Sequence, residues 1–149
     1  MATTSGRIRA ISISQQKGTP KFNVPAADLQ VDHGIVGDAH AGSGHRQVSL
    51  LAFDSIEMVR RQGVEIAPGD FAENLTVEGL DLSSIPVGSR LRVGDSVELE
   101  VTQRGKQCHG RCAIFERLGD CIMPHEGIFA RVKHAGHIQV GDIVEVVDD

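Results

Sequence analysis

The residues best suited to chemistry in this sequence are cysteines in a basic stretch. Cys108 has Lys106 on one side and His109 and Arg111 on the other, and Arg104 shortly precedes them. Neighbouring positive charges favour the thiolate over the thiol, and the thiolate is the form that acts as a nucleophile or binds metals. We therefore predict a catalytic or metal-binding sulfur at Cys108, with packing of a small side chain beneath a loop as the alternative.

Two further cysteines, Cys112 and Cys121, follow closely and could support Cys108, either by sharing a metal with it or by pairing with it on oxidation. With His109 and His125 they also offer the sulfur and imidazole ligands that zinc takes in tetrahedral sites. Zinc is the weaker interpretation, because structural zinc sites usually pair two C-x2-4-C knuckles and this stretch holds one. Burial of Cys121 as a small hydrophobic residue stays open as an alternative.

A second group of polar residues lies in a glycine-rich stretch between positions 32 and 46. Asp38, His40 and Arg46 offer a hydrogen-bond acceptor, a titratable donor and a fork that binds anions with two hydrogen bonds. Glycines permit positive φ and close approach of the backbone, and here they stand at positions 34, 37, 42 and 44. The stretch is no nucleotide loop, since it lacks both the Walker ending and a G-x-G-x-x-G. The alternative is that Asp38 and His40 only hold the turn through hydrogen bonds to nearby backbone.

A third polar pair, Glu73 and Asn74, stands just before an apolar run. These side chains could contact a ligand, but they could equally satisfy backbone amides at the start of a strand. We favour the structural role.

The elements that must position these residues are mostly strands, because apolar and polar residues alternate with a period of two. The expected strands are Ile8–Ile13, Arg46–Leu51, Asn74–Val77, Arg90–Val93 and Ser96–Thr102. The period changes over Ala52–Gln62, where a helix is predicted with Gly63 in the C′ position. A separate short segment of one or two helical turns is expected over Ala113–Leu118.

Many short strands with glycine-rich turns favour a mainly β fold, a closed or nearly closed β-barrel with one or two short helices, since closure removes exposed strand edges. The cysteine stretch follows directly on the strand Ser96–Thr102, so a rigid strand would present it. Val93–Glu98 resembles Val140–Glu145, and we interpret both as a Gly-Asp turn that leads into a strand. No linker composition divides residues 1–149, so we expect a single domain.

Composition excludes several classes of partner. The formal net charge is -5 and aromatic residues make up 3%, without Trp or Tyr, which argues against nucleic acid. There is no signal-peptide pattern at the N-terminus and no long apolar run, so we expect a cytoplasmic protein that does not enter a membrane. All three cysteines fall between positions 108 and 121, so disulfides between distant strands are not expected.

Taken together and in this order, these segments resemble the MOSC domain family, named for the C-terminal domain of molybdenum cofactor sulfurases. The matching segments are Gly34–His40, Arg46–Leu51, Gly69–Leu75, Val87–Leu91, Gly105–Cys108 and Gly127–Val132, followed by Gly141-Asp142. The resemblance spans roughly residues 6 to 147 and implies a barrel-like β fold with a functional cysteine at Cys108. In the molybdenum enzymes of this family that cysteine ligates the metal. For standalone members, the resemblance implies that the cysteine carries sulfur.

The sequence departs from the family in places. Gln107 stands where members often have Pro, and the region around Cys112 and Cys121 resembles a subgroup whose domain stands alone or is joined to a MogA-type molybdopterin-handling domain. The chain also lacks the N-terminal β domain of the amidoxime-reducing enzymes. A standalone member is therefore expected.

The resemblance implies a protein that binds the molybdenum or tungsten cofactor (molybdopterin) or carries sulfur for its maturation, with MogA-type proteins and a cysteine desulfurase as partners. The expected site has Cys108 on the metal or sulfur, and cofactor-binding residues Asp38, His40, Arg46, Lys106, His109 and Arg111 around it. Two alternatives stay open: a small molybdenum-dependent oxidoreductase or sulfurtransferase, and a zinc-stabilised binding module.

Overall fold

The computed structural model describes residues 5–14, 21–39, 41–42, 44, 47–61, 63, 68, 73–104 and 127–147. In these residues the elements are β1 (Ser5–Ile13), β2 (Phe22–Val24), β3 (Ala26–Gln30), β4 (Gly34–Ile35), β5 (Val48–Ala52), α1 (Phe53–Arg60), β6 (Leu75–Glu78), the 3-10 helix η1 (Leu82–Ser84), β7 (Arg90–Val93), β8 (Val97–Arg104), β9 (Ile128–His134), β10 (Gly136–Gln139) and β11 (Ile143–Val147).

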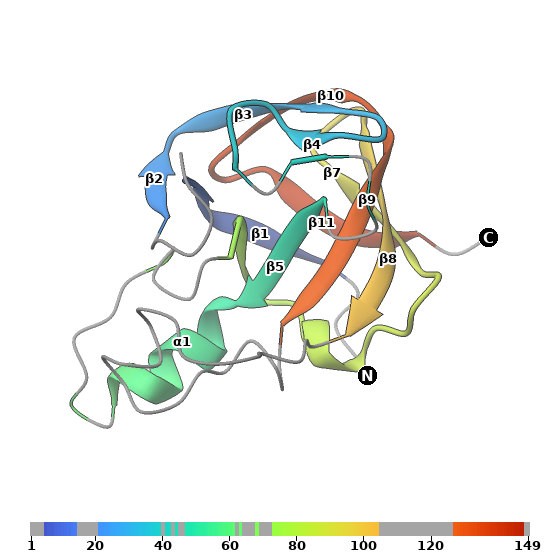
Figure 1. The fold of residues 1–149 in the computed structure, drawn as a ribbon. Helices are drawn as coiled ribbons and strands as arrows, with labels where there is room; N and C mark the ends of the chain where they lie inside the picture. Colours follow the sequence, from blue (N-terminus) through green and yellow to red (C-terminus); the bar gives the residue numbers. More distant parts are fainter. Residues whose placement is uncertain are drawn as a thin grey trace.

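The main sheet closes on itself as a barrel of seven strands (Figure 1). Its order is β11–β7–β8–β9–β5–β6–β1, and β1 pairs again with β11, with Ser5 opposite Glu145 and Arg7 opposite Ile143. β2 extends the wall by pairing with the end of β1. The predicted mainly β, closed barrel is confirmed, and α1 is the α-helix that the described residues contain.

One pair in the barrel, β5 with β6, is parallel, and Leu50 lies opposite Leu75. Parallel neighbours need a long crossover, and α1 lies on this one and packs against both strands (Figure 1). Leu51 and Ile56 are completely buried, which shows that the outer face of this wall is covered as well as its inner face. The helix begins one residue after the predicted Ala52, and Gly63, with φ of 90°, donates its amide to Arg60 as the predicted C′ glycine should.

Apolar side chains from every barrel strand fill the interior. β8 shows the pattern most clearly, since Val97, Leu99 and Val101 are buried while Glu98 and Glu100 are partly exposed. The small sheet β10–β3–β4 lies across one end of the barrel (Figure 1) and adds Leu29, Ile35 and Ile138 to the core.

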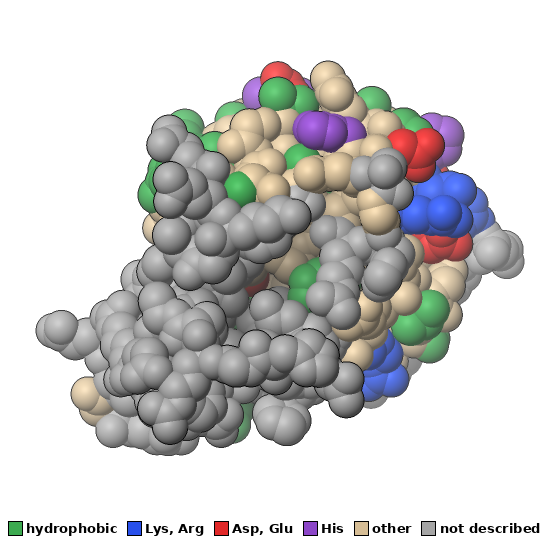
Figure 2. Space-filling model, in the orientation of Figure 1, with side chains coloured by type: hydrophobic (Ala, Val, Ile, Leu, Met, Phe, Trp, Pro, Cys, Tyr) green, Lys and Arg blue, Asp and Glu red, His purple; other side chains and the backbone are tan. Residues whose placement is uncertain are grey.

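The outer face of β7, β8, β9 and β11 carries charges of alternating sign. Arg92 lies 3.5 Å from Glu145, Arg90 lies 3.2 Å from Glu98, and Arg131 lies 2.6 Å from Glu100. Figure 2 shows basic and acidic side chains side by side on the right of the molecule. Such exposed pairs contribute little stability, so their main effect is to keep this wall solvated.

The two Gly-Asp turns share their backbone geometry, as predicted. Gly94 and Gly141 both have positive φ, 64° and 98°. The turns also touch each other, because Gly94 donates its amide to Ile143 and a Cβ on Gly94 would lie 2.8 Å from a carboxylate oxygen of Asp142. The repeated sequence therefore builds two contacting corners of the barrel.

The remaining segment predictions have mixed outcomes. Arg90–Val93 is found as predicted, and Ile8–Ile13 lies within β1. Within the described residues the predicted strand Arg46–Leu51 is found as Val48–Ala52, and the preceding Gln47 accepts the Val132 amide on its side-chain Oε1 at 2.9 Å. The predicted helical turn at Ala113–Leu118 lies outside the described residues. None of the helices in the described ranges has the length and apolar character needed to cross a membrane.

Candidate functional site

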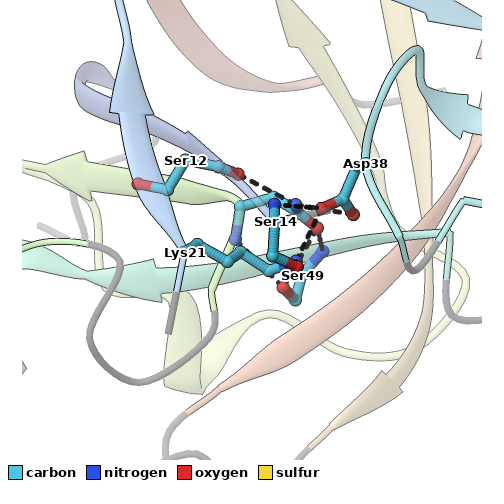
Figure 3. A network of polar contacts seen from close by, with 6 residues as sticks. Ser12, Ser14, Lys21, Asp38 and Ser49 are labelled. Atoms are coloured by element: carbon cyan, nitrogen blue, oxygen red, sulfur yellow. Dashed lines mark hydrogen bonds and ion pairs between the residues drawn. The ribbon is translucent and has the colours of Figure 1, made fainter. Parts of the chain in front are cut away.

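The carboxylate of Asp38 lies in a buried network of polar side chains (Figure 3). Its Oδ1 accepts hydrogen bonds from Lys21 Nζ at 2.7 Å and from the Ser14 amide at 3.0 Å. Its Oδ2 accepts from Asn74 Nδ2 at 3.0 Å. The side chains of Lys21 and Asp38 are both fully buried, so a complete ion pair sits beneath the surface.

Asn74 connects this ion pair to the barrel wall. Its Nδ2 also donates to the Ser12 carbonyl at 3.1 Å, and its Oδ1 accepts the Ser49 amide at 2.9 Å. The backbone amide of Asn74 also donates a hydrogen bond to Ser49 Oγ at 3.0 Å. The Asn74 side chain thus spans β1, β5 and Asp38, and the structural role predicted for Asn74 is present.

The network lies on the outer side of the wall. Side chains on a strand alternate between faces, and Ser12, Ser49 and Asn74 each stand next to a residue of the interior core. Those core neighbours are Ile11, Leu50 and Leu75. Ser12, Ser49 and Asn74 are nevertheless buried, so other segments cover them, including those that carry Lys21 and Asp38.

The surroundings of Asp38 stabilise its charged form. Burial alone would raise the pKa of this carboxyl, but the hydrogen bond and charge of Lys21, together with the amides of Ser14 and Asn74, outweigh burial and lower the pKa below its usual value. Within the described residues every buried side-chain nitrogen and oxygen has a hydrogen-bond partner. A charge pair satisfied in this way is costly to break from one side.

A row of neighbouring residues connects this network to the end of β8. Gln103 lies opposite Phe129, which lies opposite Ser49. Asn74 donates its amide to the Ser49 carbonyl at 2.9 Å, and Ser12 donates to the Asn74 carbonyl at 2.7 Å. Strands are spaced about 4.8 Å apart, so β8 ends within about 14 Å of Asn74 along the wall. The cysteine stretch follows in the sequence directly after β8.

β8 is bulged just before it ends. Val101 lies opposite Ala130 and Gln103 opposite Phe129, so Thr102 is an extra residue in the ladder. The Thr102 hydroxyl donates to the Phe129 carbonyl at 3.2 Å. Bulges redirect a strand and are frequent beside functional sites.

The glycines of the Gly-rich stretch divide into two kinds. Gly34 and Gly37 have positive φ of 113° and 92°, and a Cβ on Gly34 would lie 2.6 Å from the Gln47 carbonyl oxygen. Gly42 and Gly44 are not among the described glycines with positive φ, and a Cβ on either would meet no atom of the described residues within 4 Å. The expectation of special backbone geometry therefore holds for the first two glycines only.

Of the predicted site residues, Asp38 lies within the described part of the chain. The others lie outside the described residues, and their roles stay predictions: His40, Arg46, Lys106, Cys108, His109, Arg111, Cys112 and Cys121. The described ranges hold no cluster of three metal-ligating side chains. The zinc interpretation depends on the cysteines and stays untested with them.

Four residues of the network were missed from the sequence, namely Ser12, Ser14, Lys21 and Ser49. Lys21 lies 17 positions from Asp38, and Ser49 lies 25 positions from Asn74. Neither stands in a local motif. No local signal marks Lys21, which is buried although the next residue, Phe22, is exposed.

Comparison with known proteins agrees with this geometry. The family model described as MOSC domain matches residues 37–145. Among solved structures, the YuaD protein from Bacillus subtilis superposes with a TM-score of 0.78 at 20% identity and 95% coverage of each chain. YiiM from Geobacillus stearothermophilus has a TM-score of 0.71 at 18% identity, covering 96% of this chain and 75% of that one. YiiM from Escherichia coli has a TM-score of 0.68 at 18% identity, covering 96% and 70%.

No curated protein matches the sequence. At these identities the solved structures establish the fold alone, whereas the family model spans most of the chain, from the Asp38 segment through the cysteine stretch to β11. The chain therefore belongs to the MOSC domain family.

Proposed function

We propose that this protein binds the molybdenum or tungsten cofactor, or carries sulfur for its maturation, through Cys108. One observation of the structure supports this most. The Asn74–Asp38 hydrogen bond ties the start of the Gly-rich stretch to the same wall from which the cysteine stretch leaves. Residues suited to an anion and a residue suited to a soft metal or sulfur are therefore attached to neighbouring points of one rigid barrel.

The donor set fits this cofactor by its chemistry. A cysteine thiolate is a soft ligand suited to molybdenum, and it also accepts sulfane sulfur reversibly. The phosphate of the pterin needs cationic donors, which the sequence supplies as His40, Arg46, Lys106, His109 and Arg111. In this proposal Asp38 contributes mainly by holding its segment in place, and Cys112 and Cys121 support Cys108.

The sulfur-carrier mode has a simple chemical step. The Cys108 thiolate attacks the terminal sulfur of a persulfide on a cysteine desulfurase. The new S–S bond forms at Cys108, the S–S bond of the donor breaks, and the donor leaves as a thiolate. Cys108 then carries a persulfide, and the terminal sulfur of this persulfide would pass to a MogA-type or other molybdopterin-handling partner.

The test uses the full chain from a molybdate-fed host, purified without oxygen. Native mass spectrometry should show either bound molybdopterin or, after incubation with a cysteine desulfurase and cysteine, a gain of about 32 Da per sulfur atom added. Cys108→Ser should remain folded and lose both, while Cys121→Ser should keep the first added sulfur.

Two results would count against the proposal. A parent protein that binds no molybdopterin and gains no sulfur excludes both modes. An unfolded Cys108→Ser whose remaining folded fraction still binds or gains sulfur would make Cys108 a core residue. Turnover of an N-hydroxylated substrate that depends on Cys108 would instead favour the oxidoreductase alternative.

A further inference from the structure

The network around Asp38 clamps one short segment against the end of β1. Ser14 donates its amide to the Asp38 carboxylate at 3.0 Å and accepts the Ala39 amide on its carbonyl oxygen at 2.8 Å. Lys21 donates to both Asp38 and Ser14 Oγ. Residues 38 and 39 are therefore tied to the barrel by backbone and side-chain bonds at the same point.

The chain then folds back immediately. Ala41 donates its amide to the Asp38 carbonyl at 3.1 Å, and Gly42 donates to the His33 carbonyl at 2.6 Å. On the far side of the Gly-rich stretch, Gln47 is buried and bound to the Val132 amide of β9. The stretch that contains His40 and Arg46 is thus fastened to the barrel at both of its ends.

Holding a segment by a buried ion pair costs free energy, because both ions lose their hydration. An apolar contact could hold the segment with less desolvation, but it would not fix the direction of the chain. The Asp38 carboxylate accepts from Lys21, Ser14 and Asn74, and these donors come from separate parts of the chain. This arrangement specifies one position of the segment.

We infer that Asp38 and Asn74 are positioning residues of the cofactor site. They act through the Ala39–Ser14 contact and fix Asp38 and Ala39, the two residues that precede His40 in the sequence, against the end of β1. This inference rests on the proposed function for the identity of the ligand. The anchoring itself does not depend on that function.

The test is hydrogen exchange at the Ala39 amide, followed by NMR on the full chain. In the parent protein this amide should exchange at least 100-fold more slowly than an unprotected amide, because it is bonded to Ser14. Asn74→Ala and Asp38→Asn should each speed its exchange at least tenfold. Lys21→Gln combined with Asp38→Asn replaces the ion pair by a neutral hydrogen-bonding pair and should restore at least half of the lost protection on a logarithmic scale.

The control is Leu91→Ala, a core substitution in β7 on the opposite part of the barrel. It should lower the Tm but change exchange at Ala39 by less than twofold. Equal acceleration in Leu91→Ala and Asn74→Ala would mean that Asn74 only contributes to global stability, and would overturn the inference. An unprotected Ala39 amide in the parent would overturn it without any variant.

Binding of molybdopterin separates this inference from the proposed function. Where the parent binds, Asn74→Ala should weaken the Kd about tenfold and Leu91→Ala less than twofold. Unchanged affinity in an Asn74→Ala protein with an exposed Ala39 amide overturns the positioning role. A parent that does not bind molybdopterin contradicts the proposed ligand, while the exchange rates still decide whether the anchor exists.

Discussion

At the scale of single residues, Asp38 is the side chain whose chemistry is best defined. Its negative charge is stabilised by hydrogen bonds from Lys21, Ser14 and Asn74. Because its pKa is lowered in the folded protein, Asp38 binds its proton more weakly there than in the unfolded chain, where the pKa has its ordinary value of about 3.8. Its contribution to stability is therefore present above about pH 4 and is lost as the pH falls through the lowered value.

The corresponding prediction concerns Asp38→Asn. At pH 7 this variant should lose about 3–5 kcal/mol in free energy of unfolding, because Lys21 is left buried without its counter-charge. Between about pH 4 and pH 2 its stability should fall less steeply than that of the parent, since Asn has no proton to bind. Urea unfolding at several pH values measures both effects. Asp95→Asn, at an exposed turn, is the control, and equal acid slopes for parent and Asp38→Asn would contradict the assignment.

Arg46 carries the corresponding prediction for ligand binding. A charge-assisted hydrogen bond to phosphate contributes about 1.5–3 kcal/mol, so Arg46→Ala should weaken molybdopterin binding by roughly one to two decades. Titration with the cofactor measures the Kd, and thermal melting of the same sample measures stability. An unchanged Kd with a lowered Tm would make Arg46 structural.

The sequence identified Asp38 and Asn74 as polar residues in unusual surroundings, but it could not supply their partners. Residue type and glycine spacing are local signals, and they marked both positions. The partners Lys21 and Ser49 lie 17 and 25 positions away, and only the tertiary fold brings them close, as when β5 pairs with β6 beside Ser49 and Asn74. Whether a polar residue contacts a ligand or supports the fold therefore depends on long-range contacts, and no local sequence pattern contains these.

At the scale of elements, the turn after β3 shows how backbone geometry fixes the start of the Gly-rich stretch. Gly34 and Gly37 both have positive φ, so alanine is strained at either position. At Gly34 a Cβ would also lie 2.6 Å from the Gln47 carbonyl oxygen, whereas at Gly37 the nearest atom among the described residues is a flexible Ile13 methyl group at 4.0 Å. The two sites thus separate conformational strain from steric overlap.

We expect Gly37→Ala to cost about 1–2 kcal/mol in free energy of unfolding and Gly34→Ala at least about 1 kcal/mol more, because backbone must move to admit the methyl group. Chemical denaturation of the two variants side by side measures the difference. Equal costs would show that Gln47 moves freely, which would weaken the case that this end of the stretch is fixed.

Elements with a regular pattern were predictable, and those without one were not. β8 alternates Val97, Leu99 and Val101 with acidic residues and was expected, as was the four-residue β7. β2 and β4 have only three and two residues, and the five residues of β3 lack a regular alternation of apolar and polar side chains. β3 owes its place to a partner more than 100 positions away, since Leu29 lies opposite Gly136.

At the scale of the whole molecule, closure depends on β11. This strand pairs with β1 on one side and β7 on the other, and its Val144 is completely buried. A chain truncated after Asp142 should lose cooperative melting and elute as aggregates in gel filtration, because two strand edges are left open. Truncation after Val147, which keeps β11, is the control. A monomeric, cooperatively melting product of the shorter chain would show that the barrel tolerates an open seam.

The pairing of β1 with β11 also means that β1 must wait for its partner strand during synthesis. β1 (Ser5–Ile13) leaves the ribosome well before its partner β11 (Ile143–Val147) has been made. At roughly 5–20 residues per second, that interval is on the order of ten seconds. During this interval β1 and β7 each have an edge without its final neighbour, so the nascent chain should depend on chaperones that shield strand edges until β11 is released.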